Sequence, residues 1–271
     1  MEMSAASFDY IRRLLRDRAG IELDRTKRYL VESRLAPIAQ REQCTSLDAL
    51  VHRLREPGNG LLAEDVVEAM TTNETSFFRD GAPFTTLRDV ILPQLLRSDR
   101  ALRQLTIWCA ACSTGQEVYS IAMLIREHFA TVSDWQIRVL GSDLSQRALQ
   151  QARAGCYNSL EIARGLSVAL RDKYFRWHDD TWCVTESLRS LVEFRRINLA
   201  ADWPPLPMMD VVFVRNVMVY FDSATKRKIL GRVRRRLRPG GYLFLGGAET
   251  TLNLDNSFKR LRHAGFSYYT K

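Results

Sequence analysis

The chain has 271 residues, of which 46% are apolar and 26% charged, close to the averages of globular proteins. These values exclude a disordered or fibrous class, and the length suits one large domain or, as we favour, two ordinary ones. The formal net charge of +9 would attract nucleic acid, an anionic membrane face or an acidic protein surface.

No part of the chain has the run of about 18 apolar residues that a membrane span needs, and the N-terminal residues lack the apolar centre of an export signal. We therefore expect a cytoplasmic protein. Its five cysteines are an odd number in a long chain of this kind, so we expect reduced thiols and no structural disulfide.

Residues 7–70 are predicted to be helical. Apolar residues recur there at the three- and four-residue spacing of amphipathic helices, and no strand-like alternation interrupts them. Ser46 is a candidate helix N-cap, and the Glu-Pro-Gly-Asn-Gly run at 56–60 contains strong helix breakers. The first part of the chain should thus be an all-helical unit.

From about residue 104 the pattern changes to short β-rich segments that alternate with helical ones. The predicted strands are residues 105–110, 137–143, 192–199, 210–216 and 241–247. The predicted helices between them are residues 116–130, 145–154 and 223–237. This alternation is typical of a parallel sheet with crossover helices.

Residues 156–195 are too many for a simple crossover connection. They contain one amphipathic helix, 160–172, and two strands near 174–184 and 190–197 that we expect to pair as a small antiparallel hairpin. The expected organisation is a helical N-terminal domain, 1–75, a linker or connecting helix, 76–103, and an α/β domain, 104–271, with an antiparallel β-subdomain inserted at 173–195.

The first candidate site is the segment 108–117, Trp-Cys-Ala-Ala-Cys-Ser-Thr-Gly-Gln-Glu, where a strand runs into a helix. Small residues there let the backbone approach a ligand at the carboxyl edge of a parallel sheet, where open α/β folds bind nucleotides. The spaced glycine triple of dinucleotide sites is absent. A tight strand-to-helix turn without a ligand is the alternative.

Asp143 ends the next predicted strand and is well placed to accept hydrogen bonds from both ribose hydroxyls of an adenosine ligand. A cofactor without a pyrophosphate needs no phosphate cradle, which favours S-adenosylmethionine over a nicotinamide cofactor. Capping the helix that begins near Ser145 is an equally open role for this carboxylate.

Four segments together resemble the CheR-type chemoreceptor glutamate methyltransferases over nearly the whole chain. They are 71–79 (Thr-Thr-Asn-Glu-Thr-Ser-Phe-Phe-Arg), 108–120, 141–143 (Gly-Ser-Asp) and 214–221 (Val-Arg-Asn-Val-Met-Val-Tyr-Phe). The resemblance implies a Rossmann-like S-adenosylmethionine-dependent methyltransferase domain with a small antiparallel β-subdomain, preceded by an all-helical domain.

The resemblance also implies a pocket for S-adenosylmethionine and its product S-adenosylhomocysteine, without a metal. The residues it assigns to this pocket are Asn73, Thr75, Arg79, Glu117, Asp143, Asn198, Leu199, Arg215 and Asn216. It puts Arg79 and Tyr220 beside the transferred methyl group as catalytic residues. The family's usual Glu-Glu-Pro-Tyr is Gln-Glu-Val-Tyr at 116–119, which keeps the acid of Glu117 and alters the turn.

Methylation of a glutamate carboxylate requires no general base, because a side chain with a pKa near ~4.3 is already an anion at neutral pH. What the enzyme must supply is orientation, which can be worth about 7–11 kcal/mol. Arg79 can hold a carboxylate by a forked pair of hydrogen bonds, and the hydroxyl of Tyr220 can donate one more.

The partner that the resemblance implies is the cytoplasmic coiled-coil domain of a chemoreceptor, which presents acidic side chains. Lys27 and Arg34 align with the family's basic, receptor-facing positions, and complementary charge there would raise the encounter rate. Pro37, Ile38 and Gln40 stand where some relatives have arginine. We expect a monomer that binds no nucleic acid and does not insert into a membrane.

Some members of this family also hold a C-terminal receptor pentapeptide through the β-subdomain, using a loop with a Gly-x-Gly insertion. The corresponding turn here, residues 177–182, is short and has no glycine. We therefore expect methylation that is independent of a receptor pentapeptide.

Two other functions remain open at this point. A methyltransferase acting on RNA would suit the high charge, but the chain lacks the Asn-Pro-Pro-Tyr type of segment expected for amine methylation. A binding module that senses the cofactor without turnover is disfavoured by the retention of Arg79, Asp143 and Tyr220.

Cys109 and Cys112 form a CxxC pair without a second pair at zinc-like spacing, which disfavours a metal or redox site.

Overall fold

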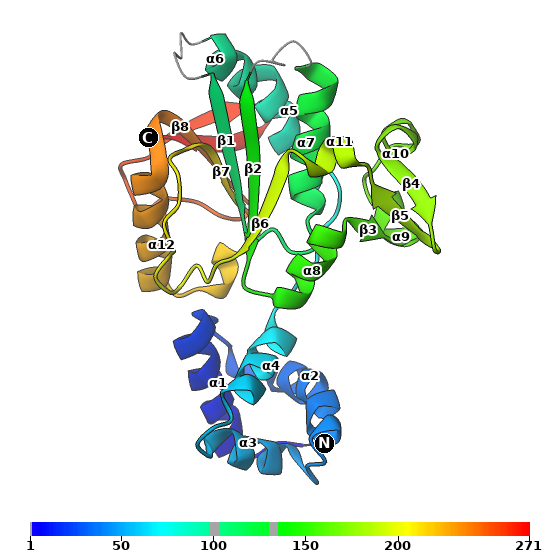
Figure 1. The fold of residues 1–271 in the computed structure, drawn as a ribbon. Helices are drawn as coiled ribbons and strands as arrows, with labels where there is room; N and C mark the ends of the chain where they lie inside the picture. Colours follow the sequence, from blue (N-terminus) through cyan, green and yellow to red (C-terminus); the bar gives the residue numbers. More distant parts are fainter. Residues whose placement is uncertain (1, 98–102, 130–134) are drawn as a thin grey trace.

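A computed structural model describes residues 2–97, 103–129 and 135–271 (Figure 1). The helices of the N-terminal unit are α1 (Ala5–Ala19), α2 (Arg28–Arg41), α3 (Leu47–Arg55) and α4 (Gly60–Met70). Figure 1 shows them grouped at one end of the molecule, facing the end of the sheet. In the described part of the chain, no helix is both long and apolar enough to cross a membrane.

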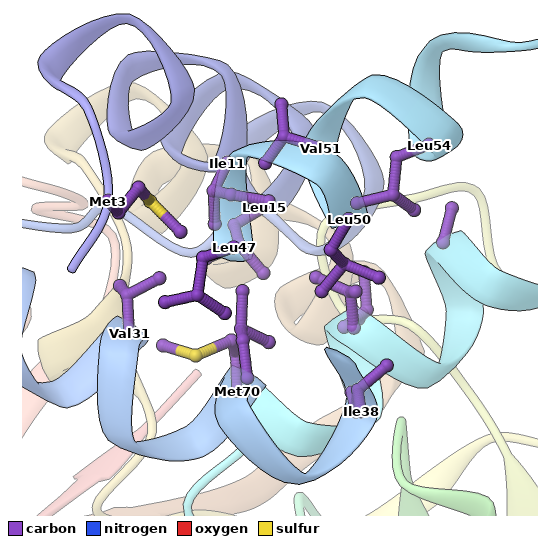
Figure 2. Packing of buried hydrophobic residues seen from close by; sticks show 14 of the residues in the cluster. Met3, Ile11, Leu15, Val31, Ile38, Leu47, Leu50, Val51, Leu54 and Met70 are labelled. Atoms are coloured by element: carbon purple, nitrogen blue, oxygen red, sulfur yellow. The ribbon is translucent and has the colours of Figure 1, made fainter. Parts of the chain in front are cut away.

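The four helices bury a common apolar core (Figure 2). Ile11 and Leu15, one turn apart on α1, are fully buried, as is Leu50 on α3. The hydroxyl of Ser46 accepts a hydrogen bond from the backbone N–H of Ala49, as expected of the N-cap of α3. The prediction of an all-helical N-terminal unit is confirmed.

Seven strands form the main sheet, in the order β6-β2-β1-β7-β8-β10-β9. They are β1 (Gln104–Ala110), β2 (Gln136–Asp143), β6 (Val192–Arg196), β7 (Met209–Val214), β8 (Leu237–Leu245), β9 (Lys259–His263) and β10 (Phe266–Thr270). The first five pair in parallel, as predicted, whereas β10 runs antiparallel to both β8 and β9. The C-terminal hairpin was not predicted.

Helices cover both faces of this sheet. Side chains alternate between the two faces along each strand, so the apolar residues of a buried strand need packing partners on both sides. On β1, Ile107 and Cys109 pack in a cluster that includes residues of α7 (Gln116–His128) and α8 (Gln146–Ala154). Trp108 and Ala110 pack on the other face, in a cluster with residues of α12 (Ser223–Arg236). Figure 1 shows α12 on the side of the sheet opposite α7.

The connecting segment packs against the α/β domain. It contains α5 (Ala82–Thr86), a π-helical turn (Leu87–Ile91) and α6 (Leu92–Arg97). Phe84 and Leu92 are buried in the cluster on the α7 face of the sheet. The segment therefore contributes to the core of the α/β domain.

A second, three-stranded sheet has the order β3-β5-β4, with β3 (Cys156–Tyr157), β4 (Phe175–His178) and β5 (Thr181–Val184). The pairing predicted between strands near 174–184 and 190–197 is wrong. The hairpin is β4–β5, and β6 instead extends the main sheet in parallel with β2. The apolar side chains of β6, such as Phe194, pack against α7 and the main sheet. This packing explains why β6 joins the main sheet and not the hairpin.

The single helix predicted at 160–172 is also wrong. The structure has two short helices, α9 (Ser159–Ala163) and α10 (Val168–Tyr174), separated at Gly165. Gly165 has a φ of +93°, and a Cβ there would lie 2.0 Å from the carbonyl oxygen of Phe77. Close approach of this backbone therefore ends the first helix.

The expectation of no disulfide is contradicted as well. Cys156 on β3 and Cys183 on β5 are bonded to each other, and Cys44, Cys109 and Cys112 are free. The two bonded cysteines are 27 residues apart in sequence but lie opposite each other in the antiparallel pair β3–β5. Strand register, which the cysteine count does not reveal, brings their side chains together.

Candidate active site

The carboxyl ends of the parallel strands face the helical domain (Figure 1). A pocket there is lined by residues of both parts of the chain. Its empty space, about 930 Å³, includes solvent at the open mouth. Its wall contains all ten residues that the family resemblance assigned to the cofactor and to catalysis: Asn73, Thr75, Arg79, Glu117, Asp143, Asn198, Leu199, Arg215, Asn216 and Tyr220. Residues of the N-terminal unit, including Ala19 and Met70, complete the wall.

The turn between β1 and α7 has an unusual backbone. Ala111 and Ser113 have positive φ values of 57° and 52°, followed by Gly115 at 95°. Non-glycine residues in this region cost on the order of 1–3 kcal/mol each, and such strain is found mainly at functional sites. At Gly115 a Cβ would lie 2.9 Å from the Cβ of Ala152, so α8 packs closely against the turn. The turn is therefore strained and tightly packed, and the close approach of its backbone to a ligand stays a prediction.

Asp143 fastens this turn to the end of β2. Its Oδ2 accepts a hydrogen bond from the N–H of Ser113 at 2.7 Å, and its Oδ1 accepts one from the N–H of Ser145 at 2.9 Å. Burial raises the pKa of Asp143 above its usual value, while the hydrogen bonds from the backbone oppose that rise. The N-cap of α8 is Ser145 itself. The carboxylate of Asp143 has further lone pairs and lines the pocket, so it can accept hydrogen bonds from a ribose.

Arg215 and Glu117 form a buried ion pair in the pocket wall. The Nη1 of Arg215 donates to Glu117 at 2.7 Å, and the two side chains are only 2% and 11% exposed. The Nη2 of Arg215 donates to Asp80 at 2.6 Å and to the carbonyl oxygen of Arg79 at 3.0 Å. The pair thereby joins α7, the end of β7 and the connecting segment.

The Nε of Arg215 is buried and has no hydrogen-bond partner among the described residues. Buried donors are rarely left unpaired, and this one belongs to a residue that lines the pocket. The pocket therefore fits S-adenosylmethionine in its chemistry. Asp143, at the end of β2, offers an acid to the ribose of the adenosine, and Arg215, just after β7, offers a buried donor in the same wall.

Arg79 and Tyr220 reach the pocket from different segments. The Nη1 of Arg79 donates to the carbonyl oxygen of Glu74 at 3.0 Å, which fixes the guanidinium within the 71–79 segment. Tyr220 ends a 3₁₀ turn, Met218–Tyr220, and its carbonyl oxygen accepts from the N–H of Glu22 at 2.8 Å. Both side chains thus line the same cavity as Asp143.

Glu249 supports this site from behind the pocket wall, a role that the sequence did not indicate. Its carboxylate accepts hydrogen bonds from the backbone N–H groups of Gly246, Asn216 and Met218, at 2.6, 2.9 and 2.7 Å. Asn216 has a φ of +58°, so this acid stabilises a strained turn that leads to Tyr220. An isolated glutamate after β8 carries no recognisable signal of that role.

Asn198 connects the two domains. Its Nδ2 donates to the carbonyl oxygen of Arg18 at 2.6 Å, and its Oδ1 accepts from the N–H of Ala200 at 3.0 Å. Leu199 beside it is buried and lines the pocket. Asn198 therefore shapes the pocket and also fixes the position of α1 against it.

The two predicted receptor contacts differ in their surroundings. Lys27 is exposed, in the 3₁₀ turn before α2. Arg34 is half-buried and donates to the carbonyl oxygens of Met70 and Thr71, both at 3.0 Å, and to the hydroxyl of Thr72 at 3.1 Å. Arg34 thus stabilises the end of α4 and the start of the segment that enters the pocket.

The two cysteines of the CxxC pair are core residues. Cys109 and Cys112 are buried, and burial raises the pKa of both thiols well above the usual value. Protonated thiols are poor nucleophiles and poor metal ligands. Within residues 2–97, 103–129 and 135–271 no cluster of histidine, cysteine and acidic side chains is arranged to hold a metal ion.

Comparison with known protein families gives two matches. Residues 6–71 match the all-alpha domain of the CheR methyltransferase family, and residues 73–265 match its S-adenosylmethionine-binding domain. The two matches meet at residues 71–73, directly after α4.

Individual relatives give the same result. The chain is 41% identical to chemotaxis protein methyltransferase 1 of Pseudomonas aeruginosa, over 97% of this chain and 96% of the relative. It is 40% identical to chemotaxis protein methyltransferase Cher2 of Pseudomonas putida over the whole of both chains. A chemotaxis protein methyltransferase of Vibrio parahaemolyticus is 38% identical, over 96% of this chain and 94% of the relative.

Proposed function

This chain belongs to the CheR methyltransferase family and is an S-adenosylmethionine-dependent enzyme, and from that premise we propose that it methylates glutamate side chains of chemoreceptors. The products are glutamate methyl esters and S-adenosylhomocysteine. The proposed partner is the cytoplasmic coiled-coil domain of the receptor. The proposal includes a receptor-facing helical domain, 1–75, and a catalytic domain, 104–271.

One observation carries the proposal: Arg79 and Tyr220 line the same pocket as Asp143, Glu117 and Arg215. The side chain of Arg79 is a fork of hydrogen-bond donors, and that of Tyr220 is a phenol. Neither would take a proton from a substrate at neutral pH. Such a set suits an acceptor that is already an anion, as a glutamate side chain is.

In the proposed reaction Arg79 binds the incoming carboxylate through its paired N–H groups, and Tyr220 donates one hydrogen bond to it. When bound, S-adenosylmethionine supplies an electrophilic methyl group and is left as a neutral thioether, so no proton changes hands. Asp143 orients the adenosine end, and the Arg215–Glu117 pair keeps the pocket wall rigid. Orientation then provides most of the rate enhancement.

The direct test is incubation of the enzyme with tritium-labelled S-adenosylmethionine and receptor cytoplasmic domains. We expect base-labile label on the receptor, released as methanol on alkaline treatment, because carboxyl methyl esters hydrolyse in base. Receptor whose methylation-region glutamates are replaced by alanine should acquire none. Base-stable label on the receptor, or label transferred to RNA instead, would contradict glutamate methylation.

We also propose that methylation is independent of a receptor C-terminal pentapeptide. β4 and β5 are joined by only Asp179 and Asp180, both with positive φ, at 44° and 59°. Two such residues make a tight hairpin turn with the twist that suits its strands, and they leave no loop to enclose a peptide.

Isothermal titration calorimetry with a free receptor pentapeptide should therefore detect no binding at micromolar concentrations. Receptors with and without the pentapeptide should be methylated at the same rate. A dissociation constant in the micromolar range would show that this part of the proposal is wrong.

A further inference from the structure

An acid of the helical domain, Glu68, reaches the helix that follows Asp143. One carboxylate oxygen accepts a hydrogen bond from the hydroxyl of Ser145, and the other accepts from the N–H of Gln146 at 2.9 Å. Ser145 is fully buried. Figure 1 shows α4 directed at this end of α8. Glu68 thus caps a helix of the α/β domain from outside it, 77 residues away in sequence from Ser145.

Two successive hydrogen bonds connect Glu68 to Asp143, which lines the proposed pocket for the methyl donor. Ser145 donates its N–H to Oδ1 of Asp143, whose Oδ2 accepts from the N–H of Ser113. The hydroxyl of Ser113 donates in turn to the carbonyl oxygen of Asn73 at 2.7 Å, in the segment that follows α4. Glu68 itself does not line the pocket. It belongs to a ring of contacts that closes around Asp143 from both domains.

We propose that Glu68 is a positioning residue for the methyl-donor pocket, acting through Ser145 to hold the carboxylate of Asp143 toward the ligand. The proposal rests on the proposed role of Asp143 in binding the adenosine end. It makes the helical domain a contributor to cofactor affinity as well as a candidate receptor-facing surface.

The contact requires two acceptors, which only an ionised carboxylate offers. The hydroxyl oxygen of Ser145 already accepts from the N–H of Ala148 at 3.0 Å and from the amide of Asn73 at 3.3 Å. Its proton must therefore go to Glu68. Glutamine would accept one of the two bonds and would turn an N–H toward the N–H of Gln146. A negative side chain also interacts favourably with the N-terminus of α8.

The chain offers a matched control. Glu64, one turn earlier on α4, also reaches the α/β domain, where it pairs with Arg196 at 3.4 Å. Both of those side chains are about half exposed, at 49% and 46%, and exposed pairs contribute little. Glu64→Gln removes a charge from the same helix and the same domain boundary without touching Ser145.

We expect Glu68→Gln to weaken S-adenosylhomocysteine binding about tenfold, a loss of roughly 1.4 kcal/mol, in calorimetric titration at pH 7.5. Glu64→Gln should stay within about twofold of the wild type. Thermal unfolding without ligand establishes that each variant is folded. Equal losses for the two variants, or wild-type affinity for Glu68→Gln, would overturn the assignment.

A further readout separates positioning from general destabilisation. In a Ser145→Ala background, Glu68→Gln should cost less than half of what it costs in the wild type, whereas full additivity would contradict action through Ser145.

These binding experiments do not depend on receptor methylation. Wild-type affinity in Glu68→Gln would remove the role of Glu68 and leave glutamate methylation intact. Failure of the wild type to label receptors would remove the proposed substrate while the difference between Glu68→Gln and Glu64→Gln still stood.

Discussion

Replacing Arg79 by alanine is expected to reduce methyl transfer to receptors by a factor of about 100–1,000. Loss of a single donor that stabilises developing charge costs about that much in other enzymes, and Arg79 is proposed to supply two. The change should leave the fold intact, because the side chain's bond within the described residues is to the carbonyl oxygen of Glu74 and the carbonyl of Arg79 still accepts from Arg215.

The measurement is the rate of base-labile labelling at saturating receptor, with the dissociation constant for S-adenosylhomocysteine determined in parallel. Arg79→Lys keeps the charge and loses the fork, so it should recover only part of the rate. Arg88→Ala is the matched control, because this arginine lies in the connecting segment and pairs on the surface with Asp89. Turnover within about threefold of the wild type for Arg79→Ala would remove the catalytic assignment.

Replacing Arg215 by methionine is expected to lower the free energy of unfolding by about 3–5 kcal/mol. The change leaves the carboxylate of Glu117, which is 11% exposed, without its cation in the wall of the pocket. Removing one partner of a buried pair is costly because the other charge loses its compensation while it stays out of water. Since domains are stable by only ~5–15 kcal/mol, this is a large fraction of the total.

Denaturation in urea checks the prediction, with the midpoint and slope compared between variants. The double variant Glu117→Gln/Arg215→Met should regain at least half of the loss, because the buried side chain of Glu117 is then neutral and Asp80, which also loses its partner, is 52% exposed. Arg164→Met is the control, since its partner Glu74 is 67% exposed and the pair should contribute under about 1 kcal/mol. A loss below about 1 kcal/mol for Arg215→Met, or no recovery in the double variant, would contradict the interpretation of the pair.

Local patterns in the sequence determined the N-terminal helices, the five parallel strands and the edge of the sheet at which the site lies. Apolar spacing defined the helices of residues 7–70, and the β-rich runs defined five strands. Carboxyl ends of parallel strands share one edge, which predicted a site at that edge, and Asp143 ends β2 while Arg215 follows β7. The pairing of β2 and β7 with β1 in the structure then brings both residues near the turn after β1. The resemblance of four short segments then assigned their chemistry, and all of the assigned pocket residues line one cavity.

The tertiary structure decided what depends on contacts between distant residues. It brought Glu249 beneath the turn at Asn216, paired Cys156 with Cys183, and put β6 at the edge of the main sheet instead of in the hairpin. Glu68 meets Ser145 because the end of α4 lies against the start of α8.

The physical reason is the range of the forces involved. Helix and strand patterns depend on residues that are close together in the sequence, so a short stretch of the sequence is enough to predict them. Which strand lies beside which, and which carboxylate caps which turn, depends on how whole surfaces pack and on where buried polar groups find partners. From the sequence alone, Glu68 would be predicted to be a solvent-exposed helix residue. Its contacts become visible only when the α/β domain is placed against α4.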